Sequence, residues 1–236
     1  GEQSVCEKGL SFYRLLDHDR AKKGNGWTKM IWNLIRHGQT DWNLQRRFQG
    51  QTDIPLNDTG RNQALEAAAK CKKEGLHFCR VYSSPLERAV ETAEIVSVIK
   101  REDPRFFIDQ RLIEMDFGPL DGTAFDHEHN EKIGCLFTHP SQFQFPEGME
   151  TYEELRTRTA DFISSLLEKE GASGDENILI QSHGACLRGL LARLSQLETD
   201  DFWRMTIDNC ELFRYRVEEG RITKLDRPLQ LNRIPR

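Results

Sequence analysis

The chain has 236 residues, of which 30% are charged and 37% are hydrophobic, a balance typical of a soluble globular protein. The formal net charge of -5 argues against a nucleic-acid-binding surface, which needs an excess of Lys and Arg. No apolar run is long enough to span a bilayer. The six cysteines are scattered without metal-type spacing, as expected for reduced thiols. We therefore expect a cytoplasmic protein that contacts neither nucleic acid nor a membrane.

Residues 23–26 are charged and rich in Gly, and they form the one plausible domain boundary in the sequence. We expect residues 1–29 to be an N-terminal extension of unknown role, in which residues 12–16 could pack on the body as a strand or a helix. Residues 30–236 then form one domain, a length ample to bury a core.

Short apolar segments alternate with amphipathic ones along that domain. Strands are expected at residues 30–35, 78–82, 106–108 and 177–181, with a closing hairpin of 211–217 and 221–225. Helices are expected after the Asn57–Gly60 turn and at 86–99, 151–169 and 185–194. Residues 118–148 have weak periodicity and are interpreted as a substrate-covering insertion with some helix. The alternation predicts a three-layer α/β/α sandwich around a mostly parallel sheet.

Two places share one pattern, in which a buried strand ends at a His-Gly pair. They are His37-Gly38 after residues 30–35 and His183-Gly184 after 177–181. Ligands of open parallel sheets bind outside the carboxyl ends of the strands, so the two histidines are expected to share one cleft.

Two arginines accompany these histidines. Arg36 precedes His37, and Arg88 lies in the first turn of the helix after Ser83-Ser84-Pro85. A guanidinium is permanently charged and offers planar donors that match phosphate oxygens. Together the four side chains predict a phosphate site, where positive charge is concentrated locally despite the negative net charge.

The segment RHGQTDWN at residues 36–43 resembles the signature of the histidine phosphatase superfamily, whose fold is phosphoglycerate mutase-like. The resemblance continues in family order through RFQG at 47–50, SSPLERA at 83–89, LIE at 112–114 and SHG at 182–184. The segment EGMET at 147–151 is similar to the family's Gly-Gly-Glu-Ser, with Met149 in place of a glycine. Residues 30–236 are thus expected to be a histidine phosphatase domain.

The resemblance implies a role for each matching residue. His37 attacks phosphorus, while Arg36, Arg88 and His183 hold the phosphoryl oxygens. Glu114 protonates the leaving alcohol and then activates water. Asn43, Gln49 and Gly50 line the entrance, and the backbone of Gly184 and Ala185 adds N–H donors. No metal or other cofactor is expected, because positioned arginines can replace the Mg²⁺ of kinases.

Three alternatives stay open. His37, His183 and Glu114 could ligate zinc, although Arg36 and Arg88 beside them disfavour a divalent cation. The domain could also be a non-catalytic module that binds phosphorylated ligands. The third alternative is a 2,3-bisphosphoglycerate-dependent phosphoglycerate mutase.

Against the mutase stands the segment after Glu114. In mutases of this family it typically reads Glu-Arg-His-Tyr-Gly, but here it reads EMDFG, and Lys132 is the one Lys or Arg between Met115 and Glu150. A second phosphate clamp is hard to build from this segment. We therefore predict a phosphatase acting on a small phosphorylated metabolite. Phe125, Phe137, Phe143 and Phe145 line an apolar pocket or belong to the core; the substrate and any homo-oligomer remain undetermined.

Overall fold

The structure is a computed structural model that describes residues 30–125, 131–169, 176–218, 221–226, 229 and 231–232. Its strands are β1 (Met30–Arg36), β2 (Phe78–Ser83), β3 (Phe106–Ile108), β4 (Glu176–Ser182), β5 (Leu212–Glu218) and β6 (Arg221–Lys224). Its α-helices are α1 (Asp41–Leu44), α2 (Asp58–Lys73), α3 (Glu87–Ser97), α4 (Glu131–Thr138), α5 (Tyr152–Lys169) and α6 (Gly184–Ser195). Short 3-10 helices are η1 (Gln110–Leu112), η2 (Gly118–Leu120), η3 (Pro140–Gln142) and η4 (Thr199–Arg204).

The strands form one sheet in the order β3-β2-β4-β1-β5-β6. The first four are mutually parallel, and β5 and β6 complete the sheet as an antiparallel edge. Parallel neighbours require long crossovers, which the helices supply, whereas β5 and β6 are adjacent along the chain and pair as a hairpin. The predicted mostly parallel sheet is confirmed.

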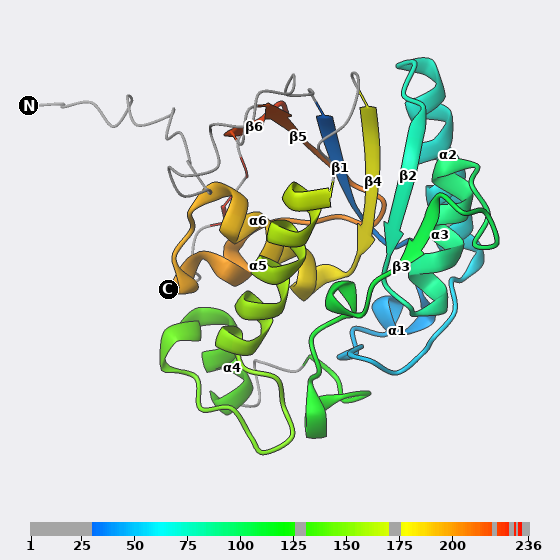
Figure 1. Ribbon diagram of the computed structural model, residues 1–236. Coiled ribbons are helices and arrows are strands. Elements are labelled where there is room, and N and C mark those ends of the chain that lie inside the picture. Colours follow the sequence, from blue (N-terminus) through cyan, green and yellow to red (C-terminus); the bar gives the residue numbers. More distant parts are fainter. Residues whose placement is uncertain are drawn as a thin grey trace, which may run out of the picture.

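Helices cover both faces of the sheet (Figure 1). Helices α5 and α6 pack on one face and α2 and α3 on the other, and each face has its own apolar cluster. Side chains of β1 alternate between them: Trp32 and Leu34 enter the α5–α6 cluster and Ile35 the α2–α3 cluster. A strand buried on both faces reads as a continuous apolar run, which is why β1 was recognisable in the sequence. The three-layer α/β/α architecture is confirmed.

The predicted elements lie within two residues of the observed bounds, except that the helix expected after the Asn57–Gly60 turn begins inside that turn, at Asp58, as α2. The expected insertion at 118–148 contains η2, α4 and η3, with residues 126–130 outside the described part. The expected extension 1–29, including residues 12–16, also lies outside it. Among the described residues, none of the helices combines the length and apolarity needed to cross a membrane.

A close backbone approach fixes the loop that leaves β1. Gly60 lies in the first turn of α2, where its N–H donates to the side chain of Asn57, the N-cap residue, at 2.9 Å. A Cβ on Gly60 would lie 2.1 Å from the Gln39 carbonyl oxygen, and one on Gly38 would lie 2.4 Å from the Gly60 carbonyl oxygen. Both positions therefore require glycine, and the start of α2 supports the loop after His37.

This contact predicts a stability difference between two glycine substitutions. Gly60→Ala should lower the free energy of unfolding by about 3 kcal/mol, because backbone must move to admit the methyl group. Gly75→Ala is the control: Gly75 has φ +70 but no atom near its Cβ position, so only the left-handed backbone costs about 1 kcal/mol. Denaturant unfolding measures both, and equal losses would contradict the close approach.

Candidate active site

The register between β1 and β4 brings the two histidines together. Arg36 pairs with Ser182 in the parallel ladder, so His37 and His183 leave the sheet at the same level. Their ring centroids lie 5.1 Å apart, and both side chains are buried. The predicted convergence of the two His-Gly pairs is therefore observed.

The imidazole of His37 is oriented by its own loop. Its Nδ1 lies 2.7 Å from the Gly38 carbonyl oxygen, which can only accept, so Nδ1 carries the hydrogen and Nε2 has the lone pair. Asn209 donates to the His37 carbonyl oxygen at 2.8 Å, and Thr92 accepts from the Gly38 N–H at 3.1 Å. Burial, followed by the charges of Arg88 and Arg36, holds the pKa of His37 well below its ordinary value. His37 is thus a neutral base with a defined free nitrogen.

His183 is also neutral, and its contacts define the other tautomer. Arg88 Nε donates to its Nδ1 at 3.2 Å, so the hydrogen is on Nε2, which lies 2.6 Å from the Ser84 hydroxyl oxygen. Burial, then the charge of Arg88, holds the pKa of His183 well below its usual range. Ser84 is a contact for which sequence reasoning assigned no role.

Carbonyl oxygens, rather than carboxylates, hold the two predicted arginines. Arg36 Nη1 donates to Ile207 O at 2.8 Å, and its buried Nε has no partner in the described part of the chain. Arg88 donates to Thr52 O at 2.8 Å and to Gly50 O at 2.7 Å, and burial lowers its pKa to about 10. Carbonyl contacts orient a guanidinium without neutralising its charge.

Glu114 is held at the start of α6. Its carboxylate accepts the N–H groups of Met115 at 2.8 Å, Ala185 at 3.1 Å and Cys186 at 2.9 Å. A helix N-terminus favours a carboxylate through its unpaired N–H groups. The Ala185 N–H, which we predicted to face a ligand, therefore contacts Glu114.

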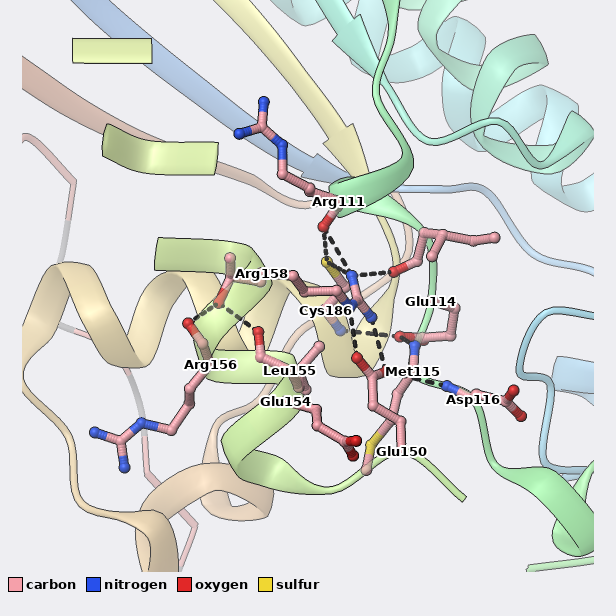
Figure 2. Close-up of polar contacts among 12 residues, drawn as sticks. Arg111, Glu114, Met115, Asp116, Glu150, Glu154, Leu155, Arg156, Arg158 and Cys186 are labelled. Atoms are coloured by element: carbon pink, nitrogen blue, oxygen red, sulfur yellow. Dashed lines mark hydrogen bonds and ion pairs between the residues drawn. The ribbon is translucent and has the colours of Figure 1, made fainter. Parts of the chain in front are cut away.

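An ion pair lies behind Glu114 (Figure 2). Arg158 of α5 makes a two-point contact with Glu150 at 2.6 and 2.9 Å. The same guanidinium donates to the Ile113 carbonyl at 2.8 Å, and Glu150 accepts the Asp116 N–H at 3.2 Å. The pair thus holds the backbone on both sides of Glu114, which fixes the carboxyl group that it carries.

A cavity of about 600 Å³ opens above these groups. It is lined by Arg36, His37, Glu114 and four of the predicted binding residues, Asn43, Gln49, Gly184 and Ala185. Arg88 and His183 are fully buried and do not line it. Gly50 does not line it either: its carbonyl accepts from Arg88 and its N–H donates to Asp121. The Gln49 amide and the Thr40 hydroxyl lie 2.6 Å apart, which fixes Gln49 at the wall.

Several cavity residues escaped sequence reasoning. The cavity is also lined by Arg46, Arg47, Arg188 and Arg204, and among its described lining residues Glu114 is the one carboxylate. These arginines come from the α1–α2 loop, α6 and η4, not from the segment after Glu114. The segment between Met115 and Glu150 has few cations, but the cavity takes its arginines from elsewhere. The composition of that segment was therefore a poor guide to the charge of the cavity. An arginine five residues after His183, on the same helix, was the available signal.

Aromatic side chains form the apolar part of the wall. Phe125 and Phe137 line the cavity, together with Phe117 and Trp203. Phe143 and Phe145 do not: they form an edge-to-face pair, and Phe145 forms another with the buried Tyr152, each with ring centroids 5.0 Å apart. All four phenylalanines pack, partly buried, against the α5–α6 cluster, and Phe125 and Phe137 also line the cavity.

The zinc alternative finds no support in the geometry. Among the residues described, no three His, Cys, Asp or Glu side chains are arranged to hold a metal ion. The lone pair of His183 Nδ1 is instead occupied by the Arg88 N–H.

The histidine phosphatase superfamily (branch 1) profile matches residues 32–227, so the chain belongs to this superfamily. It is 33% identical over 190 residues to a probable phosphoglycerate mutase, GpmB, of Salmonella arizonae, covering 79% of this chain and 85% of that protein. It is 34% identical over 168 residues to the uncharacterized phosphatase PhoE of Bacillus subtilis, covering 69% and 76%. The solved structure of YhfR from Bacillus stearothermophilus is similar with a TM-score of 0.71 at 27% identity, over 83% of this chain and 95% of that one. The relatives include phosphatases and mutases.

The neutral histidines predict how stability depends on pH. An unfolded chain protonates its histidines near pH 6.5, whereas His37 and His183, with lowered pKa values, stay neutral when folded. The unfolded state then binds more protons, so acidification from about pH 6 to 5 should lower the free energy of unfolding by up to about 1.4 kcal/mol for each histidine.

The substitution His37→Asn tests this linkage by urea unfolding at several pH values. It should remove one histidine's share of the slope between about pH 6 and 5. His77→Asn is the matched control, because His77 is an exposed histidine that does not line the cavity. An unaltered slope in His37→Asn would mean that His37 protonates equally in both states.

Proposed function

We propose that this protein hydrolyses a small phosphomonoester without a metal ion, through a phosphohistidine at His37. The observation that carries the proposal is the free Nε2 of a neutral His37 that lines the cavity beside Arg36 and Glu114. A covalent intermediate divides one difficult displacement into two easier ones.

In the first step Nε2 attacks phosphorus, a P–N bond forms and the P–O bond to the leaving alcohol breaks. Glu114 donates a proton to the departing oxygen and becomes a carboxylate. In the second step that carboxylate takes a proton from water as its oxygen attacks phosphorus. The P–N bond breaks, inorganic phosphate leaves, and neutral His37 and protonated Glu114 are restored.

The charge that develops on the phosphoryl oxygens needs fixed donors. Arg36 offers its unpaired Nε, and Arg88 retains one N–H donor on Nη2 beyond its contacts with His183, Thr52, Gly50 and the Gln49 amide oxygen. His183 exchanges its Ser84 contact for a phosphoryl oxygen in this scheme. Donors already oriented by backbone carbonyls do not have to reorganise during the reaction.

The cavity favours a small metabolite as the substrate. A volume of about 600 Å³ is in the range of small-molecule sites. The segment EMDFG lacks the arginine of the mutase pattern, which supports hydrolysis over transfer between two hydroxyl groups. We retain the mutase as the second candidate, because Arg46 and Arg188 line the cavity and supply cations for a second phosphate.

Phosphate release from a panel of phosphomonoesters in excess EDTA tests the proposal. Wild-type protein should release phosphate from at least one ester, and His37→Ala should lower that rate by at least a thousandfold, because no nucleophile remains. Conversion of 3-phosphoglycerate to 2-phosphoglycerate without phosphate release would favour the mutase, and loss of all activity in EDTA would exclude a metal-free reaction.

Glu114→Gln tests the acid role through the leaving group. The amide oxygen can still accept the N–H groups of Ala185 and Cys186, so the loop should keep its geometry. We expect the single-turnover rate of alcohol release from an alkyl phosphate to fall by about a hundredfold or more, because the alkoxide leaves without a proton. Release of 4-nitrophenolate, which needs no proton, should show a much smaller drop in the same single-turnover measurement, which precedes the attack of water. Equal losses in this first step for both esters would contradict the assignment.

A further inference from the structure

The loop of residues 50–52 holds both outer nitrogens of the Arg88 guanidinium. The Gly50 carbonyl oxygen accepts from Nη2 at 2.7 Å, and the Thr52 carbonyl oxygen accepts from Nη1 at 2.8 Å. The N–H of Arg88 that has no acceptor in the described part of the chain is also on Nη2. Because the guanidinium is planar and rigid, the positions of these two carbonyls set the direction of that free N–H.

The carboxylate of Asp121 ties this loop to the segment that follows Glu114. Asp121 accepts the Gly50 N–H at 2.7 Å and the Thr52 hydroxyl at 2.5 Å, so it contacts both residues whose carbonyls hold Arg88. The loop also packs closely there, because a Cβ on Gly50 would lie 3.0 Å from the Met115 carbonyl oxygen and 3.4 Å from Asp121 Oδ1. One carboxylate thus spans the two residues that orient the guanidinium.

Polar contacts, rather than apolar packing, hold the rest of this loop. Gln51, Thr52 and Asp53 are exposed, so few buried apolar contacts resist a movement of their backbone. Asp53 anchors the far end by accepting the Glu87 N–H at the start of α3, at 2.9 Å. The place of the Gly50 end therefore depends on Asp121.

The charge of Asp121 does not favour an anion at Arg88. Burial lowers the pKa of Arg88 to about 10, while the charges of Glu114, Asp53 and Asp121 act in the opposite sense, so the carboxylate lies within electrostatic range of the guanidinium. A negative charge at that range repels a phosphoryl group. Any benefit of Asp121 to phosphate binding must therefore come from the geometry that it gives to the loop.

We infer that Asp121 is a positioning residue, which directs the free Nη2 N–H of Arg88 at a phosphoryl oxygen through the backbone of residues 50–52. The inference rests on the proposed function, in which Arg88 holds the phosphoryl group. A donor that is already oriented does not have to reorganise when the substrate binds or reacts. Asp121 supplies this orientation from outside the cavity, without a contact to the substrate.

Calorimetry with inorganic phosphate tests the inference without any turnover. Asp121→Ala removes both contacts and should weaken phosphate binding at least tenfold. Asp121→Asn keeps an oxygen for the Gly50 N–H and an amide that can donate to the Thr52 hydroxyl oxygen, so its affinity should stay within threefold of wild type or exceed it. Thr52→Val removes one contact and should give an intermediate loss.

Glu154→Ala is the matched control. Glu154 also accepts the N–H and the hydroxyl of a threonine, Thr151, each at 2.8 Å, but at the start of α5. Its loss should change phosphate affinity less than twofold. Tighter binding by Asp121→Ala would show that the carboxylate acts only through its charge, and equal effects in Asp121→Ala and Glu154→Ala would show a merely structural role. Either result would overturn the inference.

A double-mutant cycle tests whether Asp121 acts through Arg88. Asp121→Ala should lower kcat/KM for 4-nitrophenyl phosphate at least tenfold in the wild-type background. In the Arg88→Met background it should cost less than threefold, because no guanidinium remains to be positioned. Equal losses in both backgrounds would contradict the inference. If Arg88→Met does not fold, the phosphate measurement decides alone.

The two measurements separate this inference from the proposed hydrolysis. If no ester is hydrolysed but phosphate affinity follows the expected order, the role of Asp121 stands and the proposed hydrolysis fails. If His37-dependent hydrolysis occurs and Asp121→Ala changes neither phosphate affinity nor kcat/KM, hydrolysis stands and the role of Asp121 fails.

Discussion

The parallel pairing of β1 with β4 is the constraint on which the site depends. Because Arg36 stands opposite Ser182, the chain leaves both strands at one level and the two imidazoles follow side by side. A slip of one residue would send every side chain of the slipped strand to the opposite face. The apolar clusters on both faces oppose such a slip. The packing that stabilises the sheet therefore also sets the distance between His37 and His183.

Features encoded in local patterns were predictable, and features built by tertiary contact were not. The apolar runs of β1 and β4, each ending at a His-Gly pair, predicted the strands, the sheet edge and the histidines. Arg204 gave no such signal and Arg188 gave only its spacing from His183, because the places of both in the cavity depend on how α6 and η4 pack against each other. Phe125, Phe137, Phe143 and Phe145 could not be told apart in the sequence. Their different environments depend on how α4 and η3 pack.

Two kinds of arginine can be distinguished by what holds them. Arg158, Arg111 and Arg214 contact carboxylates, so their charge is compensated within the fold. Arg36, Arg88 and Arg188 are held by backbone carbonyls, which orient the guanidinium and leave its charge for a ligand. Burial is the largest cause of the lowered pKa values of His37 and His183, and the uncompensated charges of Arg88 and Arg36 add to it. The arginines that attract an anion thus also help to keep the imidazoles neutral.

The site has two parts: the reacting groups at the edge of the sheet, and an outer wall of the cavity formed by other segments. This arrangement is compatible with one fold that serves both phosphatases and mutases. The reacting groups lie at strand ends and at the start of α6, where the backbone is held by the ladder and by helix N–H groups. The outer wall comes from the α1–α2 loop, α4 and η4, which contact the leaving group but not the phosphoryl group in the proposed scheme. Substitutions in those segments can change the substrate while leaving the sheet register intact. Cavity residues such as Phe137 and Trp203 lie outside the motifs that define the superfamily, so the outer wall can vary independently of the reacting groups.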